Sequence, residues 1–361
     1  MSELRVMQAG AGFWGTGWAK VLTESRWANL EALVDLDDEA LHRVADSVAL
    51  PADRRFSSVT KALASCDANA ALVVVPPEAH APVAIEALEA GLHCLIEKPL
   101  APTFAEAKRI VETGERVGRE VMVSQTFRFR RGARTVQRLV EEGAVGRIGA
   151  IHGRLFKEMH VPGFRELMDE PLIVDQTIHH FDFVRGVFGL EPVRVRAHSY
   201  NPSWSWFRGN ANAIVDFETE DGTFVSYSGS WVSRGGPEIN TTIDGSWDIQ
   251  GDNGAIQWDH NSVILVPQDF ADVLFRPGAL ERYGHTLEVP LIPLEEEERW
   301  GVLREFAAAI REGRRAETNG RQNLGSVALV LAAVEATKRG GWLEISEFIR
   351  GATGEEAIAK Q

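Results

Sequence analysis

The chain has 361 residues, 44% of them hydrophobic and 25% charged, which is typical of a soluble globular protein with two domains. Its 38 Lys and Arg residues against 52 Asp and Glu residues give a net charge of −14, which disfavours nucleic acid or an anionic membrane as a partner. Two cysteines exclude a disulfide framework, and the lack of a signal-peptide pattern or long apolar run predicts a cytoplasmic protein outside the membrane.

The N-terminal segment has the order strand, glycine turn, helix, strand. Leu4 to Ala9 is a short apolar run typical of a buried parallel strand, and "GAGFWG" follows it in the GxGxxG spacing. Residues 15–25 then predict a helix, and "LEALVD" predicts a second strand that ends at Asp35. In this context the glycines predict a dinucleotide site, because they permit a tight turn, approach to a pyrophosphate and close helix–strand packing. The residues of the turn expected to contact the cofactor are Gly10, Gly12, Phe13, Trp14 and Gly15.

Asp35 decides which dinucleotide is expected. Its carboxylate lies where it can accept hydrogen bonds from the hydroxyls of a ribose, and it would repel a 2′-phosphate. The following residues, Leu36-Asp37-Asp38, offer no cation that would compensate. The sequence therefore favours NAD over NADP.

The alternation of strands and helices continues as far as residue 129. Strands are expected over 70–75, 92–100 and 120–129, and helices over about 80–90 and 103–117, the second opened by a capping box of Thr103 and Glu106. This pattern predicts a doubly wound parallel sheet, in which ligands bind beyond the carboxyl ends of the strands. The residues expected at those ends are Pro76, Pro77, Glu97 and Lys98, with His80 nearby as a further cofactor contact or the start of a helix.

The pattern changes near Ile148. Strand-like runs cover about 147–156, 194–200, 211–222 and 223–231, and in the last of them Val225 and Tyr227 alternate with serines. Helices are expected over 295–313 and 323–340. We therefore expect an NAD-binding domain over residues 1–125 and an α+β substrate and oligomerisation domain over 126–361, built on a large, mostly antiparallel open sheet.

The segment "DQTIHHFD" places Asp175, His179 and Asp182 along one helical stripe. The stripe is typical either of a structural network or of an acid–base site, and Asp182 fits an anchor for the helix. His180 points off the stripe, toward the core or toward a substrate pocket. Adjacent histidines seldom face one ion on a helix, so no metal site is expected here.

Together, "GAGFWG", "VVVPPEAH", "EKPL" and "DQTIHHFD" resemble the glucose-fructose oxidoreductase / inositol dehydrogenase / rhizopine-catabolism (Gfo/Idh/MocA) family over nearly the whole chain. The resemblance implies a Rossmann domain, a C-terminal domain with an open sheet, and a homo-dimer or homo-tetramer. It implies an NAD-dependent dehydrogenase that acts on a CH–OH group of a sugar, cyclitol or related polyol. Carried over by position, it makes Lys98, Asp175 and His179 the catalytic group.

The chemistry of these three residues fits that reaction. Oxidising a CH–OH group requires a base within hydrogen-bond reach of the hydroxyl, and neutral His179 is the candidate. A helix beginning close to Asp175 would disfavour the imidazolium, while Asp175 orients the histidine or binds hydroxyls. Lys98 would hydrogen-bond the reacting oxygen, with Glu97 and Pro99 fixing its direction.

Substrate contacts are less defined. Lys157 and Arg165 are candidates for hydroxyl or carboxylate binding, and Trp204, Trp206 and Phe207 favour a subunit interface over stacking on a sugar. Residues 171–174 and 125–127 depart from the family pattern, which bears on the substrate more than on the reaction class. The alternatives are an NADP-linked keto-sugar reductase and a non-catalytic, dinucleotide-sensing regulator.

Overall fold

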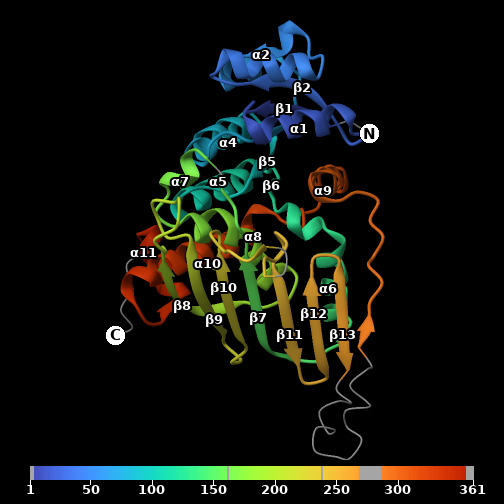
Figure 1. Ribbon diagram of the computed structural model, residues 1–361. Coiled ribbons are helices and arrows are strands. Elements are labelled where there is room, and N and C mark those ends of the chain that lie inside the picture. Colours follow the sequence, from blue (N-terminus) through green and yellow to red (C-terminus); the bar gives the residue numbers. More distant parts are fainter. Residues whose placement is uncertain (1–3, 161, 237–238, 268–285, 355–361) are drawn as a thin grey trace, which may run out of the picture. The chain divides into compact units, whose positions relative to one another are not determined.

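The computed structural model describes residues 4–160, 162–236, 239–267 and 286–354 (Figure 1). Its contacts group the chain into two compact units, Met1–Phe129 with Glu295–Val327 and Arg130–Leu294 with Ala328–Gln361. Residues 295–327 thus pack with the first unit, whereas the sequence-based division kept everything after residue 125 together. A domain boundary at residue 125 stays a prediction.

The first unit is built on a parallel sheet, as the sequence predicted. Its six strands lie in the order β3-β2-β1-β4-β5-β6, and each neighbouring pair is parallel. The strands are β1 (Leu4–Ala9), β2 (Ala28–Val34), β3 (Arg55–Phe56), β4 (Ala70–Val73), β5 (His93–Glu97) and β6 (Val121–Ser124). The helices are α1 (Phe13–Glu24), α2 (Asp38–Ser47), α3 (Val59–Ser65), α4 (His80–Glu89), α5 (Phe104–Val117) and α9 (Glu298–Glu312).

Helix α5 shows how local sequence sets these elements. Thr103 is its N-cap, and the hydroxyl oxygen accepts a hydrogen bond from the backbone N–H of Glu106 at 3.2 Å. The helix ends at Gly118, whose φ of +66° is the left-handed conformation that glycine adopts at low cost. The capping box predicted from Thr103 and Glu106 therefore marks the true start of the helix.

The strand expected over 120–129 is shorter than predicted. It ends at Ser124, and residues Thr126–Phe129 form a 3₁₀ turn. The backbone N–H of Arg128 donates to the carbonyl of Gln125 at 3.1 Å, so the chain closes a local turn here instead of extending the ladder.

The second unit is built on a nine-stranded sheet in the order β14-β13-β12-β11-β7-β10-β9-β8-β15. All neighbouring pairs are antiparallel except β7 with β10, which run parallel. The strands are β7 (Ile148–Phe156), β8 (Pro192–Tyr200), β9 (Asn212–Thr219), β10 (Phe224–Ser230), β11 (Ser246–Gly251), β12 (Gly254–Asp259), β13 (Ser262–Pro267), β14 (Leu287–Glu288) and β15 (Leu343–Glu344). The mostly antiparallel sheet predicted from the sequence is confirmed.

Helix α8 (Thr177–Gly186) lies beside this sheet (Figure 1), and aromatic side chains connect the two. Phe181 packs edge-on against Tyr227, and Phe183 packs against Trp247 and Trp258 of the sheet. Gly153 makes room for this packing, because a Cβ there would lie 2.3 Å from the ring of Trp247. The alternation of Val225 and Tyr227 with serines thus places the apolar side chains on the buried face of the sheet, where both are 1% exposed.

The other helices of this unit are α6 (Arg131–Glu141), α7 (Phe164–Leu167), α11 (Ile345–Thr353) and the second part of α10 (Gly320–Arg339), which begins in the first unit. Within the described ranges, no helix combines the length and apolarity needed to cross a membrane.

Candidate functional site

The glycine turn has the geometry that its spacing predicted. Gly10 adopts a φ of +111°, and a Cβ on it would lie 2.5 Å from the carbonyl oxygen of Val74. A Cβ on Gly15 would lie 2.3 Å from the carbonyl oxygen of Gly10, so this glycine lets α1 pack against the turn. The side-chain amide of Gln8, fully buried in β1, donates to the carbonyls of Gly10 and Gly15 at 2.8 Å each.

The same turn fits an anionic group of a dinucleotide. A Cβ built on Gly12 meets no atom within 4 Å, so open space adjoins the start of α1. Gly12 is the N-cap and supplies no side-chain hydrogen bond to the first turn. The first N–H groups of a helix that lack a side-chain cap form a ready-made site for phosphate. Phe13 and Trp14 lie exposed at this end, with 86% and 47% of their surface accessible.

Asp35 lies directly after β2, beside the glycine turn. Its carboxylate accepts hydrogen bonds from the backbone N–H of Ala11 at 2.6 Å and from that of Asp37 at 2.9 Å. Asp37 in turn caps α2, accepting from the N–H groups of Glu39 and Ala40. Asp35 thus connects the two loops that border a ribose site in such a sheet.

Glu97 and Lys98 lie at the carboxyl end of β5, where the sequence placed them. The Glu97 carboxylate accepts from the indole N–H of Trp18 at 2.7 Å, the hydroxyl of Ser124 at 3.1 Å and the backbone N–H of Lys98 at 3.1 Å. Three donors on one carboxylate fix its orientation and that of the main chain that carries Lys98. Lys98 is followed by a cis peptide bond to Pro99.

His80 is the first residue of α4 and is 1% exposed. Its Nδ1 lies 2.9 Å from the carbonyl oxygen of Pro99, and its Nε2 lies 2.9 Å from that of Val75. Burial lowers the pKa of His80, against the opposing effect of these two carbonyls. His80 thus connects the loop after β4 with the loop after β5. Pro76 and Pro77 begin the short 3₁₀ turn that precedes His80.

The segment with Asp175 is a π-turn rather than the regular helix that the four-residue spacing assumed. Leu172–Gln176 form this turn, which is closed by a hydrogen bond from the backbone N–H of Thr177 to the carbonyl of Leu172. Helix α8 begins only at Thr177, so Asp175 precedes it and His179 lies in its first turn. Single π-turns of this kind are frequent at functional sites.

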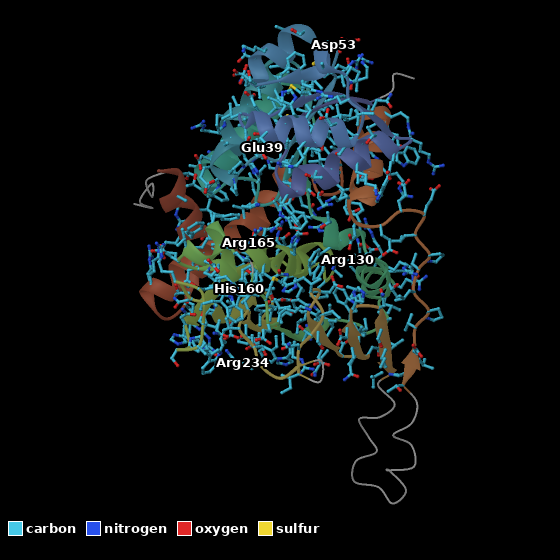
Figure 2. All side chains as sticks on the ribbon, turned by 45° about the horizontal axis from the view of Figure 1, so that its top comes forward. Glu39, Asp53, Arg130, His160, Arg165 and Arg234 are labelled. Carbon is cyan, nitrogen blue, oxygen red and sulfur yellow. The ribbon has the colours of Figure 1, made fainter. Side chains whose placement is uncertain are left out.

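Arg165 of α7, labelled in Figure 2, pairs with Asp175. Its Nε donates to Oδ2 at 2.6 Å and its Nη2 to Oδ1 at 3.3 Å, and each side chain is 15% exposed. The sequence suggested Arg165 as a substrate contact; in the structure its guanidinium contacts the carboxylate of Asp175. The pair orients Asp175 through both of its oxygens.

His179 is 6% exposed and Asp182 is fully buried on the same helix. Full burial of Asp182 agrees with the structural anchor expected for it. His179 lies almost fully buried in the first turn of α8.

His180 is fully buried and lies in the aromatic core. Its Nε2 is 3.0 Å from the carbonyl oxygen of Ile243, which only accepts, so the proton is on Nε2 and Nδ1 accepts from the hydroxyl of Tyr227 at 2.8 Å. Burial lowers its pKa to about 4. These contacts favour the core over the substrate pocket, which were the two alternatives for this residue.

The remaining candidates lie near the same segment. Lys157 directly follows β7, and its backbone N–H donates to the carbonyl of Ser230 at 2.9 Å. The indole N–H groups of Trp204 and Trp206 donate to the carbonyls of Val232 and Met159. Phe207, 3% exposed, packs on Trp231. These three aromatic residues therefore contact their own chain. Among the described residues, no cluster of His, Cys, Asp and Glu is arranged to hold a metal ion.

Three supporting residues were not identified from the sequence: Gln8, Trp18 and Ser124. A glutamine inside an apolar strand and a tryptophan on the buried stripe of α1 each carry a polar group that needs a partner. A polar group at a buried position indicates that a hydrogen-bond partner is needed, but the sequence does not identify that partner.

Two models of one family match this chain. The model described as "Oxidoreductase family, NAD-binding Rossmann fold" covers residues 4–125, and that described as "GFO/IDH/MocA C-terminal domain" covers residues 133–257.

Similar proteins agree with this match. An uncharacterized protein y4oX of Sinorhizobium fredii is 27% identical over 96% of this chain and 97% of its own length. An inositol 2-dehydrogenase of Corynebacterium glutamicum is 29% identical over 62% of this chain and 66% of its own. The crystal structure of an oxidoreductase from Agrobacterium radiobacter in complex with NAD+, L-tartaric acid and magnesium superposes with a TM-score of 0.84 at 19% identity, over 96% of this chain and 100% of that one. At that identity the superposition supports the fold.

Proposed function

The chain belongs to the Gfo/Idh/MocA family of oxidoreductases, and we propose that it is an NAD-dependent dehydrogenase of a sugar, cyclitol or related polyol. The proposal rests on the arrangement of Glu97 and Lys98 at the carboxyl end of β5. The Glu97 carboxylate accepts hydrogen bonds from Trp18 and Ser124 and from the backbone N–H of Lys98. This edge of a parallel sheet is where such folds bind their ligands. A lysine presented there suits an oxygen that gains negative charge.

The residues divide the reaction between them. When bound, NAD supplies the nicotinamide carbon that accepts the hydride from the CH–OH carbon of the substrate. His179 accepts the hydroxyl proton, so the alcohol becomes a carbonyl as one hydride and one proton leave. Lys98 hydrogen-bonds the reacting oxygen and stabilises its alkoxide character. The proposal requires Lys98 and His179 to approach the same carbon.

Asp175 acts beside the base. The ion pair with Arg165 leaves it oriented, and it then binds a substrate hydroxyl or positions His179. The exposed hydroxyls of a polyol are matched by carboxylate and lysine groups of this kind, which accept and donate hydrogen bonds respectively.

The preference for NAD rests on Asp35. Its carboxylate borders the loop after β2 and would repel a 2′-phosphate. Arg54 and Arg55, at β3 beside the end of β2, pair with Glu31 and Asp46. These two cations therefore already have carboxylate partners.

Relatives named inositol 2-dehydrogenase and D-apiose dehydrogenase support cyclitols and sugars as the substrate class. The test is a screen of NAD reduction, followed at 340 nm, over inositols, monosaccharides and sugar acids, with NADP compared at equal concentration. Turnover of at least one polyol with NAD supports the proposal. Faster turnover with NADP would indicate the keto-sugar reductase, and tight NAD binding without any turnover would indicate a regulator. A homo-oligomer in the cytoplasm remains the accompanying prediction.

A further inference from the structure

Arg299 lies against the first turns of α1, although about 280 residues separate them in the chain. Its guanidinium carbon is 4.9 Å from the ring centroid of Trp14 and 5.9 Å from that of Trp18. A Cβ on Gly17 would lie 2.4 Å from its Nη1, so the missing side chain of this glycine leaves the space that the guanidinium occupies. Helix α9 thereby brings a cation to the glycine turn within the first unit (α1 and α9 in Figure 1).

Across the described ranges, no carboxylate or carbonyl oxygen accepts a hydrogen bond from the guanidinium of Arg299. The guanidinium packs on the two indole rings. Its neighbours on α9 differ, because Arg304 pairs with Glu295 and Arg311 with Glu312. An arginine presents five N–H donors in a rigid fork, and phosphate is among the groups that fit this fork best.

The helix end beside it carries the same sign of charge. Trp14 and Gly17 lie within the first five residues of α1, about 6 Å along the axis from its N-terminus at 1.5 Å per residue. That N-terminus has a partial positive charge and uncapped N–H groups. A half-buried guanidinium and a positive helix end repel each other, and an anion bound to both offsets this repulsion.

The position of Arg299 differs from that of the site expected for the adenine ribose. Trp18 donates its indole N–H to Glu97 at the end of β5. Asp35, the ribose candidate, follows β2, which lies on the other side of β1 in the sheet. Arg299 therefore lies beside Trp18, whose indole reaches the end of β5, and near the N-terminus of α1, where the pyrophosphate of a dinucleotide sits in such a fold.

We propose that Arg299 binds the diphosphate of the dinucleotide, together with the N-terminus of α1. The assignment rests on the proposed NAD-dependent function, and it adds to it a cofactor contact from the C-terminal half of the chain. Packing on Trp14 and Trp18 holds the fork in place before the ligand arrives, which limits the entropy lost on binding.

The test measures affinity by calorimetry for two ligands, NAD and ADP-ribose, which retains the diphosphate but has no nicotinamide. Arg299→Gln is expected to weaken both by a similar factor of about 10 to 100, the range for a charge-assisted hydrogen bond to phosphate. Arg299→Lys, which keeps the charge, is expected to recover part of the loss. Raising the salt concentration should weaken NAD binding more in the wild type than in Arg299→Gln.

Arg26→Gln is the matched control. Arg26 also stacks on an indole, with its guanidinium carbon 4.6 Å from Trp27, but it already pairs with Glu295. It should leave both affinities unchanged. Equal losses in Arg26→Gln and Arg299→Gln, a loss confined to NAD, or no loss in Arg299→Gln would each overturn the assignment.

The outcome separates this assignment from the proposed function. A wild-type protein that bound neither ligand would refute both. A wild-type protein that bound NAD but oxidised no polyol would refute the dehydrogenase proposal alone, since the affinities of the Arg299 variants are read without any substrate.

Discussion

The guanidinium of Arg165 faces the carboxylate of Asp175 through two N–H groups, with Nε–Oδ2 at 2.6 Å and Nη2–Oδ1 at 3.3 Å. The carboxylate belongs to a π-turn that directly precedes the helix of His179. A two-point contact of this kind fixes both the position and the plane of the carboxylate. Arg165 therefore acts on the proposed site through Asp175.

Arg165→Gln should lower kcat by about 10- to 100-fold, because Asp175 loses its fixed orientation. It should also lower the free energy of unfolding by about 2 kcal/mol, since a mostly buried carboxylate loses its ion pair with Arg165. Both are measured on the same preparation, by steady-state kinetics with NAD and by urea unfolding. The control is Arg208→Gln, because Arg208 pairs with Asp169 where the side chains are 62% and 90% exposed. An unchanged kcat in Arg165→Gln would show that Arg165 does not orient Asp175 for catalysis.

Asp35→Asn should weaken NAD binding and narrow its advantage over NADP, measured as the ratio of the two dissociation constants. The substitution removes the charge that repels a 2′-phosphate. Its amide oxygen still accepts from the N–H of Ala11, whereas its NH2 group cannot accept from that of Asp37. Asp35→Ala removes both the charge and the acceptor for the N–H of Ala11. Comparing the two variants therefore separates the effect of charge repulsion from the effect of holding the loop in place. Asp38→Asn, in the first turn of α2, is the control and should leave the ratio unchanged. A wild-type ratio in Asp35→Asn would mean that Asp35 does not select the cofactor.

The parts of the fold that the sequence predicted are those specified by neighbouring residues. The glycine turn, the strand that ends at Asp35 and the cap at Thr103 each depend on a few adjacent positions. Periodicity likewise placed Val225 and Tyr227 on the buried face of the second sheet. Local sequence was therefore sufficient to indicate a dinucleotide-binding sheet followed by an antiparallel one.

The contacts that orient the candidate site come from residues that the fold brings together. Trp18 and Glu97 are 79 positions apart, and they meet only because the fold brings Trp18 of α1 to the carboxyl end of β5. The stripe of Asp175 and His179 assumed 3.6 residues per turn, and the π-turn over Leu172–Gln176 breaks that period. Helix propensity does not distinguish a π-turn from an α-turn, so the sequence alone does not predict this feature.

Lys98→Ala should lower kcat by about 10² to 10³-fold while the affinity for NAD stays within a few-fold of wild type. The expected loss is that of one donor to an oxygen that develops negative charge. Turnover and NAD binding are measured separately, by stopped-flow reduction and by calorimetry. Lys108→Ala is the control, because Lys108 forms an exposed pair with Glu112 on α5 and should change neither quantity. Near-wild-type turnover in Lys98→Ala would contradict the proposed role.

His180 should make the stability of the protein depend on pH below neutrality. Burial lowers its pKa in the folded protein to about 4 from the ordinary 6.5. Between these values the unfolded chain binds a proton that the folded protein does not, so the free energy of unfolding falls as pH falls from 6.5 toward 4. Over 2.5 pH units this amounts to about 3 kcal/mol for a single group. Above pH 6.5 the ring is neutral in both states and the contribution is constant.

Unfolding by urea at pH 7 and at pH 4.5 measures this loss. His180→Phe keeps a ring in the aromatic core of Trp247 and Tyr227 but cannot titrate, so its stability should fall less between the two pH values than that of the wild type. It should be less stable than wild type at pH 7, because the hydroxyl of Tyr227 and the carbonyl of Ile243 lose their partner. His42→Gln, at an exposed position of α2, is the control and should leave the wild-type pH dependence in place. An equal fall in His180→Phe and wild type would show that other groups cause it, with His93, whose pKa burial also lowers to about 4, as the next to substitute.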